Sequence, residues 1–249
     1  NRVTTVSPTY AMEIKDPWYS HNLDPILRDR SWKLTGILNG IDVDNYNPET
    51  DKDLYANYGL EDMSGKAKNK QELQKRLGLD VNSNVPIVGM VTRMVAHKGI
   101  DLVKSGLEQL LYEEDMQFII LGSGDWEYET FFKEMQNKYP GRVNASFGFV
   151  PELSRKIYAG SDIFLMPSKS EPCGLSQMIA LRYGTIPIVR ETGGLKDSIH
   201  DSGDGKGNGI TFKNYDAMDM INAVKRALQG YYNKDGWNIL VKRAMQSDN

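Results

Sequence analysis

The sequence has a single cysteine and no apolar stretch long enough to cross a membrane. One cysteine, Cys173, excludes an internal disulfide framework and any zinc site built from several cysteines. It also fits a reducing compartment, so we expect the protein in the cytoplasm. The net charge is only −3, which gives no reason to expect nucleic acid or an anionic membrane as the partner.

The first residues carry neither an initiator methionine nor the basic and apolar segments of a signal peptide. Residues 1–7 instead have the composition of a strand entered part-way. Residues 245–249 continue a helical pattern and show no signal for a helix end. We therefore expect a piece of a longer protein. Its 249 residues are still enough to bury a core without a disulfide or a metal.

Residues 1–60 are predicted to be a lead-in segment, with short strands at 3–6 and 34–38. A charged helix follows over 66–78, with Leu73 and Leu77 on one apolar face. From there, apolar runs of strand length alternate with amphipathic helical patterns. The predicted strands are 87–91, 118–121, 143–149, 163–166, 186–189 and 210–212, and the predicted helices are 100–112, 127–138, 152–159, 176–183 and 217–228.

This alternation predicts an α/β fold in which a parallel sheet is covered by helices on both faces, the doubly wound arrangement. Ligands bind such sheets at the carboxyl ends of the strands. Functional residues should therefore follow strands directly. The glycine-rich stretch 202–209 is predicted to be a plain flexible loop.

Two cations lie in the turn between the strand 87–91 and the helix that opens at Ile100. Arg93 offers a planar fork that suits phosphate, and Lys98 follows as a mobile point charge. Together with the helix N-terminus they could neutralise a diphosphate. A solvated basic turn would show the same spacing, and the pattern alone does not decide between the two.

The segment 168–177 follows the strand 163–166 in a similar way. Pro172 and Gly174 shape a tight turn, and the amides of residues 174–176 would be free donors at a helix start. Such donors bind anions, while Glu171 is placed to accept hydrogen bonds from hydroxyl groups. A serine N-cap beside a surface glutamate would explain this segment alone. The two turns together favour a sugar phosphate as the ligand.

A third turn, Gly122-Ser123-Gly124-Asp125, follows the strand 118–121. Without a third glycine it is a weak signal for dinucleotide binding. Asp125 is more simply explained as the N-cap of the next helix. A dehydrogenase-like domain would need G-x-G-x-x-G after its first strand and an acidic residue after its second, and neither pairing is present.

Six segments, in this order, resemble the C-terminal half of bacterial glycogen synthases and plant starch synthases. They are 38–42 (LNGID), 92–101, 121–125 (LGSGD), 170–177 (SEPCGLSQ), 181–187 (LRYGTIP) and 192–195 (TGGL). The likeness covers nearly the whole chain. It implies a GT-B glycosyltransferase, in which two Rossmann-like domains face a cleft. Residues 61–249 would be the nucleotide-sugar-binding domain, and the N-terminal acceptor domain would lie outside this sequence.

The resemblance implies transfer of glucose from ADP-glucose, or UDP-glucose, to the 4-hydroxyl end of an α-1,4-glucan with retention. Arg93 and Lys98 would hold the donor diphosphate and stabilise the departing nucleoside diphosphate. Glu171 would bind the hydroxyls of the donor glucose. It is the only candidate in these turns for a nucleophile beneath the anomeric carbon, and its family role favours attack within an ion pair over a covalent intermediate. No cofactor or metal is implied, because no Asp-x-Asp motif is placed to hold a divalent ion.

The same resemblance implies further binding residues. Asn39 matches the asparagine of the family's N-G-[IV]-D motif, which reaches toward the sugar and the diphosphate. Phe149 stands where the family often has an aromatic ring stacked on the base. The loop that contacts the sugar and the distal phosphate through backbone amides is matched by Cys173, Gly174, Leu175 and Ser176.

Two departures from the family pattern stand out. Ile179 occupies the place where the wider superfamily has a second glutamate, which removes one possible ribose contact. The family's N-terminal Lys-[TS]-Gly-Gly-Leu loop and its cleft histidine are absent, and Glu191, not a lysine, precedes Thr192. Since catalysis in a cleft requires both walls, we expect this chain alone to bind nucleotide weakly and to catalyse nothing.

Two other interpretations stay open. Another retaining GT-B enzyme, of the sucrose or trehalose-phosphate type, would share the Arg93 and Lys98 turn but not the block around Cys173. A non-catalytic nucleotide- or glucan-binding module would have the same fold. The intact set of Arg93, Lys98 and Glu171 argues against such a degenerate site. His97 is interpreted as a solvated turn residue, although it could touch phosphate.

Overall fold

A six-stranded parallel sheet forms the centre of the computed structural model, which describes residues 1–248. Its strand order is β5-β4-β3-β6-β7-β8, so the order reverses at the β3/β6 pair. The strands are β3 (Ile87–Val91), β4 (Gln117–Gly122), β5 (Val143–Phe147), β6 (Ile163–Met166), β7 (Ile186–Arg190) and β8 (Ile210–Phe212). The predicted doubly wound α/β fold is confirmed.

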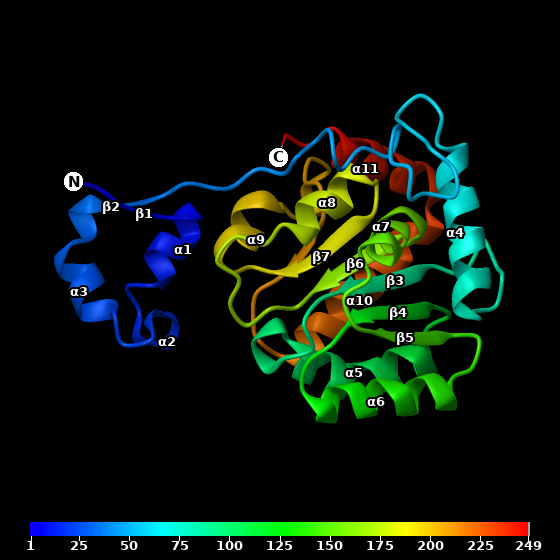
Figure 1. The fold of residues 1–249 in the computed structure, drawn as a ribbon, viewed down its shortest axis with the longest axis horizontal. Helices are drawn as coiled ribbons and strands as arrows, with labels where there is room; N and C mark the ends of the chain where they lie inside the picture. Colours follow the sequence, from blue (N-terminus) through cyan, green and yellow to red (C-terminus); the bar gives the residue numbers. More distant parts are fainter. Residues whose placement is uncertain (249) are drawn as a thin grey trace.

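Helices cover both faces of this sheet. In Figure 1, α5, α6 and α10 lie on one face, and α7 and α8 lie on the other. The helices of this domain are α4 (Ser64–Leu77), α5 (Ile100–Glu113), α6 (Trp126–Lys138), α7 (Pro151–Gly160), α8 (Ser176–Arg182), α9 (Gly193–Ser198), α10 (Ala217–Tyr232) and α11 (Lys234–Met245). Because both faces are covered, the strands are apolar almost without interruption; Ile87, Phe118 and Ile163 are fully buried.

The structure corrects several predicted boundaries. The strand expected over 143–149 ends at Phe147, and the helix expected over 217–228 continues to Tyr232. The helix α9 was not predicted, and the helical pattern noted at the C-terminus belongs to α11, which ends at Met245 and does not continue through residues 246–248. The stretch 202–209 is not a plain loop, because it contains a 3-10 turn over Ser202–Asp204 and is closed by a hydrogen bond from Ser202 N to Gly209 O of 2.8 Å.

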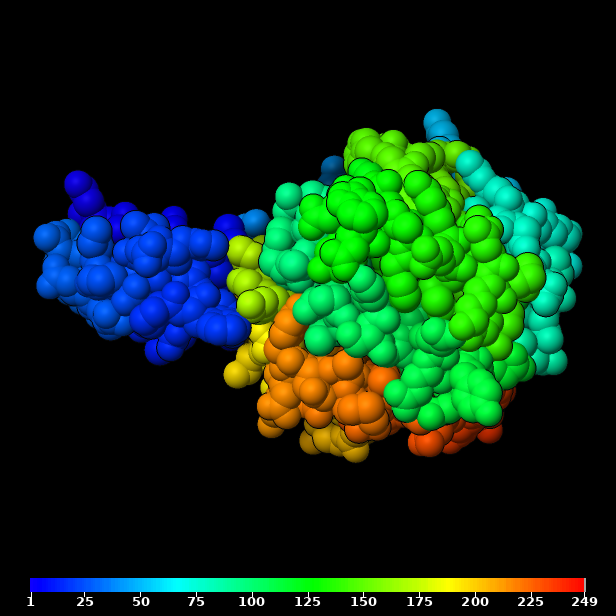
Figure 2. All heavy atoms as spheres, turned by 90° about the horizontal axis from the view of Figure 1, so that it is seen from below, coloured from blue at the N-terminus to red at the C-terminus, as the bar shows by residue number. Residues whose placement is uncertain are grey.

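Residues 1–36, which we call the N-terminal lobe, form a small separate layer. Its strands β1 (Val3–Thr5) and β2 (Leu34–Gly36) pair with each other in parallel and not with the large sheet. The strand predicted over 34–38 thus ends at Gly36. The helices α1 (Pro8–Glu13), α2 (Pro17–Ser20) and α3 (Asp24–Asp29) lie between the two strands in the chain. Figure 2 shows the lobe meeting the main body along a narrow waist.

Carboxylates hold the N-terminal lobe against α9. Asp197 Oδ2 accepts hydrogen bonds from Ser7 Oγ at 2.6 Å and from Thr9 N at 2.9 Å. Glu13 Oε1 accepts from Thr192 Oγ1 at 2.9 Å and from Gly193 N at 3.0 Å. The contact therefore joins the start of the chain to the Thr192–Leu195 motif.

Two glycines let α9 approach the loop that precedes α8. Gly193 has a φ of 44°, and a Cβ there would lie 2.0 Å from the carbonyl oxygen of Glu171. At Gly194 a Cβ would lie 2.1 Å from the carbonyl oxygen of Cys173. The amide of Gly194 donates to the Glu171 carbonyl at 3.0 Å. A side chain at either position would push these two segments apart.

Lys66 fixes the first turn of α4 to the amino-terminal edge of the sheet. Its ammonium donates to the carbonyls of Ala159, Ser161 and Tyr183 at 3.0, 3.1 and 3.0 Å, and to Thr185 Oγ1 at 2.9 Å. Burial lowers the pKa of Lys66 to about 7, while these four oxygens favour the charged form. One side chain thus satisfies acceptors from two separate connections, the one between α7 and β6 and the one between α8 and β7.

Replacing Lys66 tests this anchor. We expect Lys66→Met to lower the free energy of unfolding by about 3 kcal/mol, because buried carbonyl groups would lose their donor. Urea unfolding of the chain measures this. Lys68→Met is the matched control: Lys68 is exposed and pairs only with Glu72, so its loss should cost less than about 0.5 kcal/mol. Equal effects of the two changes would show that Lys66 is no anchor.

Replacing Gly194 tests the close approach of α9. We expect Gly194→Ala to destabilise the chain by about 2 kcal/mol or more, because its methyl group would collide with backbone. Gly230→Ala, inside α10, is the control: its Cβ would meet nothing nearer than 3.7 Å. It should stabilise the helix by about 0.5–1 kcal/mol. Thermal unfolding of both variants measures these effects. An unchanged unfolding temperature for Gly194→Ala would contradict the interpretation.

Candidate functional site

The turns after β3 and β6 meet at the carboxyl edge of the sheet. Lys169 N donates to the carbonyl of His97 at 3.0 Å, which ties one turn to the other. Lys98 Nζ lies 2.6 Å from Glu171 Oε2, and Ser168 Oγ donates to the same oxygen at 3.1 Å. The structure thus brings the predicted residues Lys98 and Glu171 into one ion pair.

The explanation of residues 168–177 as a capped helix with a surface glutamate is wrong on both points. Glu171 is only 6% exposed. The N-cap position of α8 belongs to Leu175, which has no capping side chain, and Ser176 is the first residue of the helix. The backbone amides of the first turn of α8 therefore have no side-chain acceptor at the cap.

The loop over residues 168–174 is fixed by the side-chain amide of Gln177 and the guanidinium of Arg190. Gln177 Nε2 donates to the carbonyls of Cys173 and Gly174, each at 3.1 Å. Arg190 donates to the carbonyls of Ser168 and Lys169 at 2.9 and 2.6 Å. The sequence analysis gave no role to Gln177 within the 170–177 segment, or to Arg190, because both act through contacts with the backbone that the residue type alone does not reveal.

Asn39 is brought to this loop from the extended segment that leaves the N-terminal lobe. Its backbone amide donates to the sulfur of Cys173. Burial raises the pKa of the Cys173 thiol, which therefore stays protonated at neutral pH. The buried thiol acts here as a small packing group that receives a backbone donor, while the Asn39 residue remains exposed.

Arg93 lies apart from the ion pair, in a hollow of about 410 Å³ that we call the edge hollow. Phe149, Leu175 and Ser176 line it as well, so four predicted residues meet there. The ring of Phe149 is 93% exposed and contributes nothing to the core. The edge hollow is also lined by Thr92 and Ser123, which lie in two of the segments singled out from the sequence, and by Ser154 and Tyr158, which sequence reasoning missed.

His97 lies beside Arg93, with 3.4 Å between His97 Nε2 and a guanidinium nitrogen. Desolvation lowers the pKa of His97 first, and the charges of Lys98 and Arg93 lower it further. These influences favour the neutral imidazole, whose Nε2 accepts from Arg93 in the tautomer that carries its proton on Nδ1. His97 is exposed in this turn, which confirms its prediction as a solvated turn residue, and its contact with Arg93 is an addition to that prediction.

Ile179 lines the edge hollow at the position where the sequence lacks a second glutamate. It is buried, so this part of the hollow is apolar. Tyr158 lies beside it and makes a hydrogen bond with the side chain of Ser176. Burial raises the pKa of Tyr158 to about 12, so its hydroxyl remains neutral. The hollow therefore offers one cation, neutral hydroxyls and an aromatic ring.

Asp125 takes the N-cap position of α6 as predicted, but its side chain accepts no capping hydrogen bond. Instead, Glu129 Oε1 accepts from Gly124 N at 3.1 Å. Within residues 1–248, no cluster of three or more His, Cys, Asp or Glu side chains could hold a metal ion. In the same described range, no helix has both the length and the apolar character needed to span a bilayer.

The site can hold a ligand of three chemical parts. The exposed Phe149 ring suits a planar base, the Arg93 and Lys98 cations suit a diphosphate, and the Glu171 carboxylate suits hydroxyl groups. Arg93, Lys98 and Glu171 follow β3 and β6, the two strands between which the strand order reverses, and Phe149 follows β5 at the side of the sheet. The order along the edge is thus that of a nucleotide linked to a sugar.

Known proteins were compared with the whole chain. It is 52% identical to glycogen synthase from Clostridium acetobutylicum and 50% identical to glycogen synthase from Bacillus cereus, over the full chain in both cases. The chain spans about half the length of these curated relatives, 53% and 52%. The sequence-based resemblance to glycogen and starch synthases is confirmed.

Solved structures give the same result. The catalytic domain of starch synthase IV from Arabidopsis thaliana, in a structure with ADP and acarbose bound, superposes with a TM-score of 0.93 at 40% identity. The match covers 100% of this chain and 52% of that one. The family described as glycosyl transferases group 1 matches residues 69–238, which is more than half of the sequence. The chain therefore belongs to the group 1 glycosyl transferases.

Proposed function

We propose that this chain is the donor-binding part of a glycogen synthase, which transfers glucose from ADP-glucose or UDP-glucose to the 4-hydroxyl end of an α-1,4-glucan. The observation that carries the proposal is the Lys98–Glu171 ion pair beside the edge hollow with Arg93 and Phe149. The curated relatives named glycogen synthase support it.

In the proposed reaction the nucleoside diphosphate leaves as negative charge develops on it. Arg93 is exposed and unpaired with any carboxylate of residues 1–248, so its charge is available to the diphosphate. Lys98 already neutralises Glu171. One ammonium can therefore bridge the sugar-binding carboxylate and the phosphate, and thereby set the distance between the two ends of the donor.

Glu171 is proposed to position the sugar, not to attack it. Its Oε2 oxygen is occupied by Lys98 and Ser168, so its nucleophilicity is low. The backbone amides at the start of α8 would hold the distal phosphate, and Asn39 would approach from the opposite side. These roles leave the acceptor hydroxyl to attack on the face from which the diphosphate departs, with retention.

The acceptor side is proposed to come from a domain that packs on the N-terminal lobe. The lobe's two-stranded sheet has free edges within the described residues. Large apolar side chains such as Trp18, Ile26 and Trp32 are exposed on it, Trp32 at 74%. Isolated two-stranded sheets are marginal and apolar surface of this kind calls for a partner. Residues 1–60 would then belong to the junction of the two domains, in a cytoplasmic enzyme.

Calorimetric titration with ADP, UDP and ADP-glucose tests the diphosphate site. We expect Arg93→Ala/Lys98→Ala to weaken ADP binding about tenfold or more, because two charged donors are lost. The matched control Lys104→Ala/Lys133→Ala removes the same charge from α5 and α6, outside the edge hollow, and should bind ADP normally. Equal binding by both double variants would refute the assignment.

The same variants test catalysis once the chain is joined to an acceptor domain, so that both sides of the cleft are present. This chain alone should make no glucan. Detection of glucan synthesis by the chain alone would contradict the need for an acceptor domain. Joined to the N-terminal half of the Clostridium acetobutylicum relative, the chain should become active. The Arg93→Ala/Lys98→Ala change should then reduce the rate about a hundredfold or more, because leaving-group stabilisation is lost.

Phe149→Ala tests the base position separately. We expect it to weaken the binding of ADP and UDP about fivefold or more, since stacking on an aromatic side chain contributes about 1–3 kcal/mol. The free energy of unfolding should change by less than about 0.5 kcal/mol, because the ring is exposed. Trp126→Ala, 77% exposed at the start of α6, is the control and should leave binding unchanged. Unaltered affinity in Phe149→Ala would exclude the ring.

A further inference from the structure

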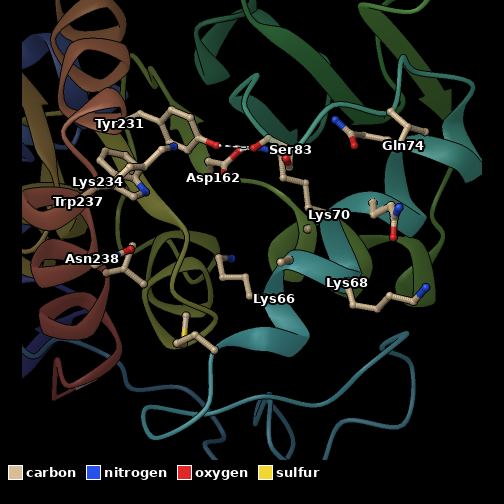
Figure 3. A pocket seen from close by; sticks show the side chains of 16 residues that line it. Lys66, Lys68, Lys70, Gln74, Ser83, Asp162, Tyr231, Lys234, Trp237 and Asn238 are labelled. Atoms are coloured by element: carbon tan, nitrogen blue, oxygen red, sulfur yellow. Dashed lines mark hydrogen bonds and ion pairs between the residues drawn. The ribbon is translucent and has the colours of Figure 1, made fainter.

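Cavities lie at both edges of the large sheet. At the amino edge, a cavity of about 630 Å³ opens between α4 on one side and α10 and α11 on the other (Figure 3). Lys70 in its wall donates to Ser83 O at 3.1 Å and to Asp162 Oδ2 at 2.8 Å, and its third hydrogen goes to the Tyr231 hydroxyl at 2.9 Å. This ammonium is therefore fully used within the chain. The edge hollow at the carboxyl edge differs, because some of its polar groups are still unused.

Hydroxyl groups dominate the polar lining of the edge hollow. Among the described residues that line it, none carries a carboxylate or a side-chain amide, and Ile179 makes part of the wall apolar. Apart from Arg93, its polar side chains all end in hydroxyls, those of Tyr46, Thr92, Ser123, Ser154, Tyr158 and Ser176. A ribose between a base and a diphosphate has hydroxyl groups that both donate and accept. The side chains that can bind them here are thus hydroxyls.

Most of these hydroxyls already have a hydrogen-bond partner. Thr92 Oγ1 and Ser154 Oγ each donate to a nearby backbone carbonyl, at 3.3 and 2.6 Å. The side chains of Tyr158 and Ser176 are hydrogen-bonded to each other. The donor hydrogens of these groups are therefore used inside the chain.

Tyr46 is different, because its hydroxyl makes no hydrogen bond within residues 1–248. The Ser123 hydroxyl is also without a partner in that range, but it lies on an exposed turn and nothing fixes its orientation. The Tyr46 side chain is half-buried, and its ring packs against the core. The free donor in a defined position is therefore the phenol of Tyr46.

Arg155 on α7 holds Tyr46 in place. Its guanidinium donates to Asn45 O at 2.7 Å and to Asn45 Oδ1 at 2.9 Å, and its carbon lies 4.7 Å from the centroid of the Tyr46 ring. Arg182 Nε donates to the Tyr46 carbonyl at 3.3 Å. The charge of Arg155 is paired with Asp51 Oδ2 at 2.9 Å, so it is not available to a phosphate. Binding to a side chain fixed in this way does not have to order it first.

The Tyr46 hydroxyl lies near the middle of the proposed ligand. Burial is the main cause that raises the pKa of Tyr158, and the electrostatic interaction with Tyr46 raises it further, so the two phenol oxygens are near each other. Phe149 and Arg93 line the same hollow, the first suited to a base and the second to a diphosphate. In a nucleoside diphosphate these two parts are joined by the ribose.

We propose that the Tyr46 hydroxyl hydrogen-bonds a ribose hydroxyl of the nucleotide donor and thereby selects ribonucleotides over deoxyribonucleotides. This inference rests on the proposed function, because it takes the edge hollow as the nucleotide site. Packing explains the ring of Tyr46 but not its hydroxyl, since a phenylalanine would fill the same space. The segment that brings Asn39 to the sugar site would thus also bring the group that binds the ribose.

Calorimetric titration with ADP, 2′-deoxy-ADP, 3′-deoxy-ADP and pyrophosphate tests this role. The unaltered chain should bind ADP about fivefold more tightly than at least one deoxy analogue, because one hydrogen bond is lost with the missing hydroxyl. Tyr46→Phe should bind ADP only as tightly as that analogue. Its affinity for the analogue itself should stay the same, because the two missing hydroxyls belong to one contact. Pyrophosphate, which has no ribose, should bind equally to both chains.

Tyr112→Phe is the matched control, because Tyr112 is 87% exposed near the end of α5 and does not line the edge hollow. It should bind all four compounds as the unaltered chain does. The proposal is overturned if Tyr46→Phe binds ADP normally, if it weakens ADP and both analogues equally, or if Tyr158→Phe removes the discrimination and Tyr46→Phe does not. Binding of ADP without any discrimination between ribose and deoxyribose contradicts this inference alone. A chain that binds no ADP contradicts the proposed function as well.

Discussion

The carbonyl oxygens of Glu171 and Cys173 lie so close to α9 that no side chain fits between them. Glycine at 193 and 194 is therefore required where the two segments touch. With Gln177 and Arg190 holding the remaining carbonyls, the loop has one available path. The position of the Glu171 carboxylate follows from that path, and with it the ion pair to Lys98. The chemistry proposed for the carboxyl edge thus depends on a backbone contact that itself carries no charge.

Lysine side chains serve different purposes at the two edges of the sheet. Lys66 donates to four protein oxygens and acts as a structural cross-link. Lys98 is paired with one buried carboxylate, so a ligand has to share it. Lys234 has only the face of an aromatic ring. The ammonium groups therefore differ in how many of their N–H groups are already donated to protein oxygens. That number, more than the charge, distinguishes a candidate binding group from a structural anchor.

Much of this could be predicted from the sequence, for identifiable reasons. The strands at 87–91, 163–166 and 210–212 were predicted to the residue, because buried parallel strands are continuous apolar runs with polar ends. Lys98 and Glu171 were found because they follow such strands. The role of Lys66, the contact of Glu13 with Thr192 and the cavity between α4, α10 and α11 were not predictable, because each joins residues that are distant in sequence. The helix α9 begins with two glycines, and because glycine has a low helix propensity the sequence predicts a loop there.

The hydrogen bonds of Asp197 and Glu13 have a mechanical consequence. They attach the N-terminal lobe to both ends of α9, a rigid helix of six residues. The same helix presses with its glycines on the backbone of residues 171–173. A tilt of the N-terminal lobe must therefore either break these hydrogen bonds or move α9 with it. Because Gly193 and Gly194 place no side chain between α9 and residues 171–173, a shift of α9 acts directly on the backbone of that loop. A movement of the N-terminal lobe is thus transmitted through α9 to the backbone at Glu171.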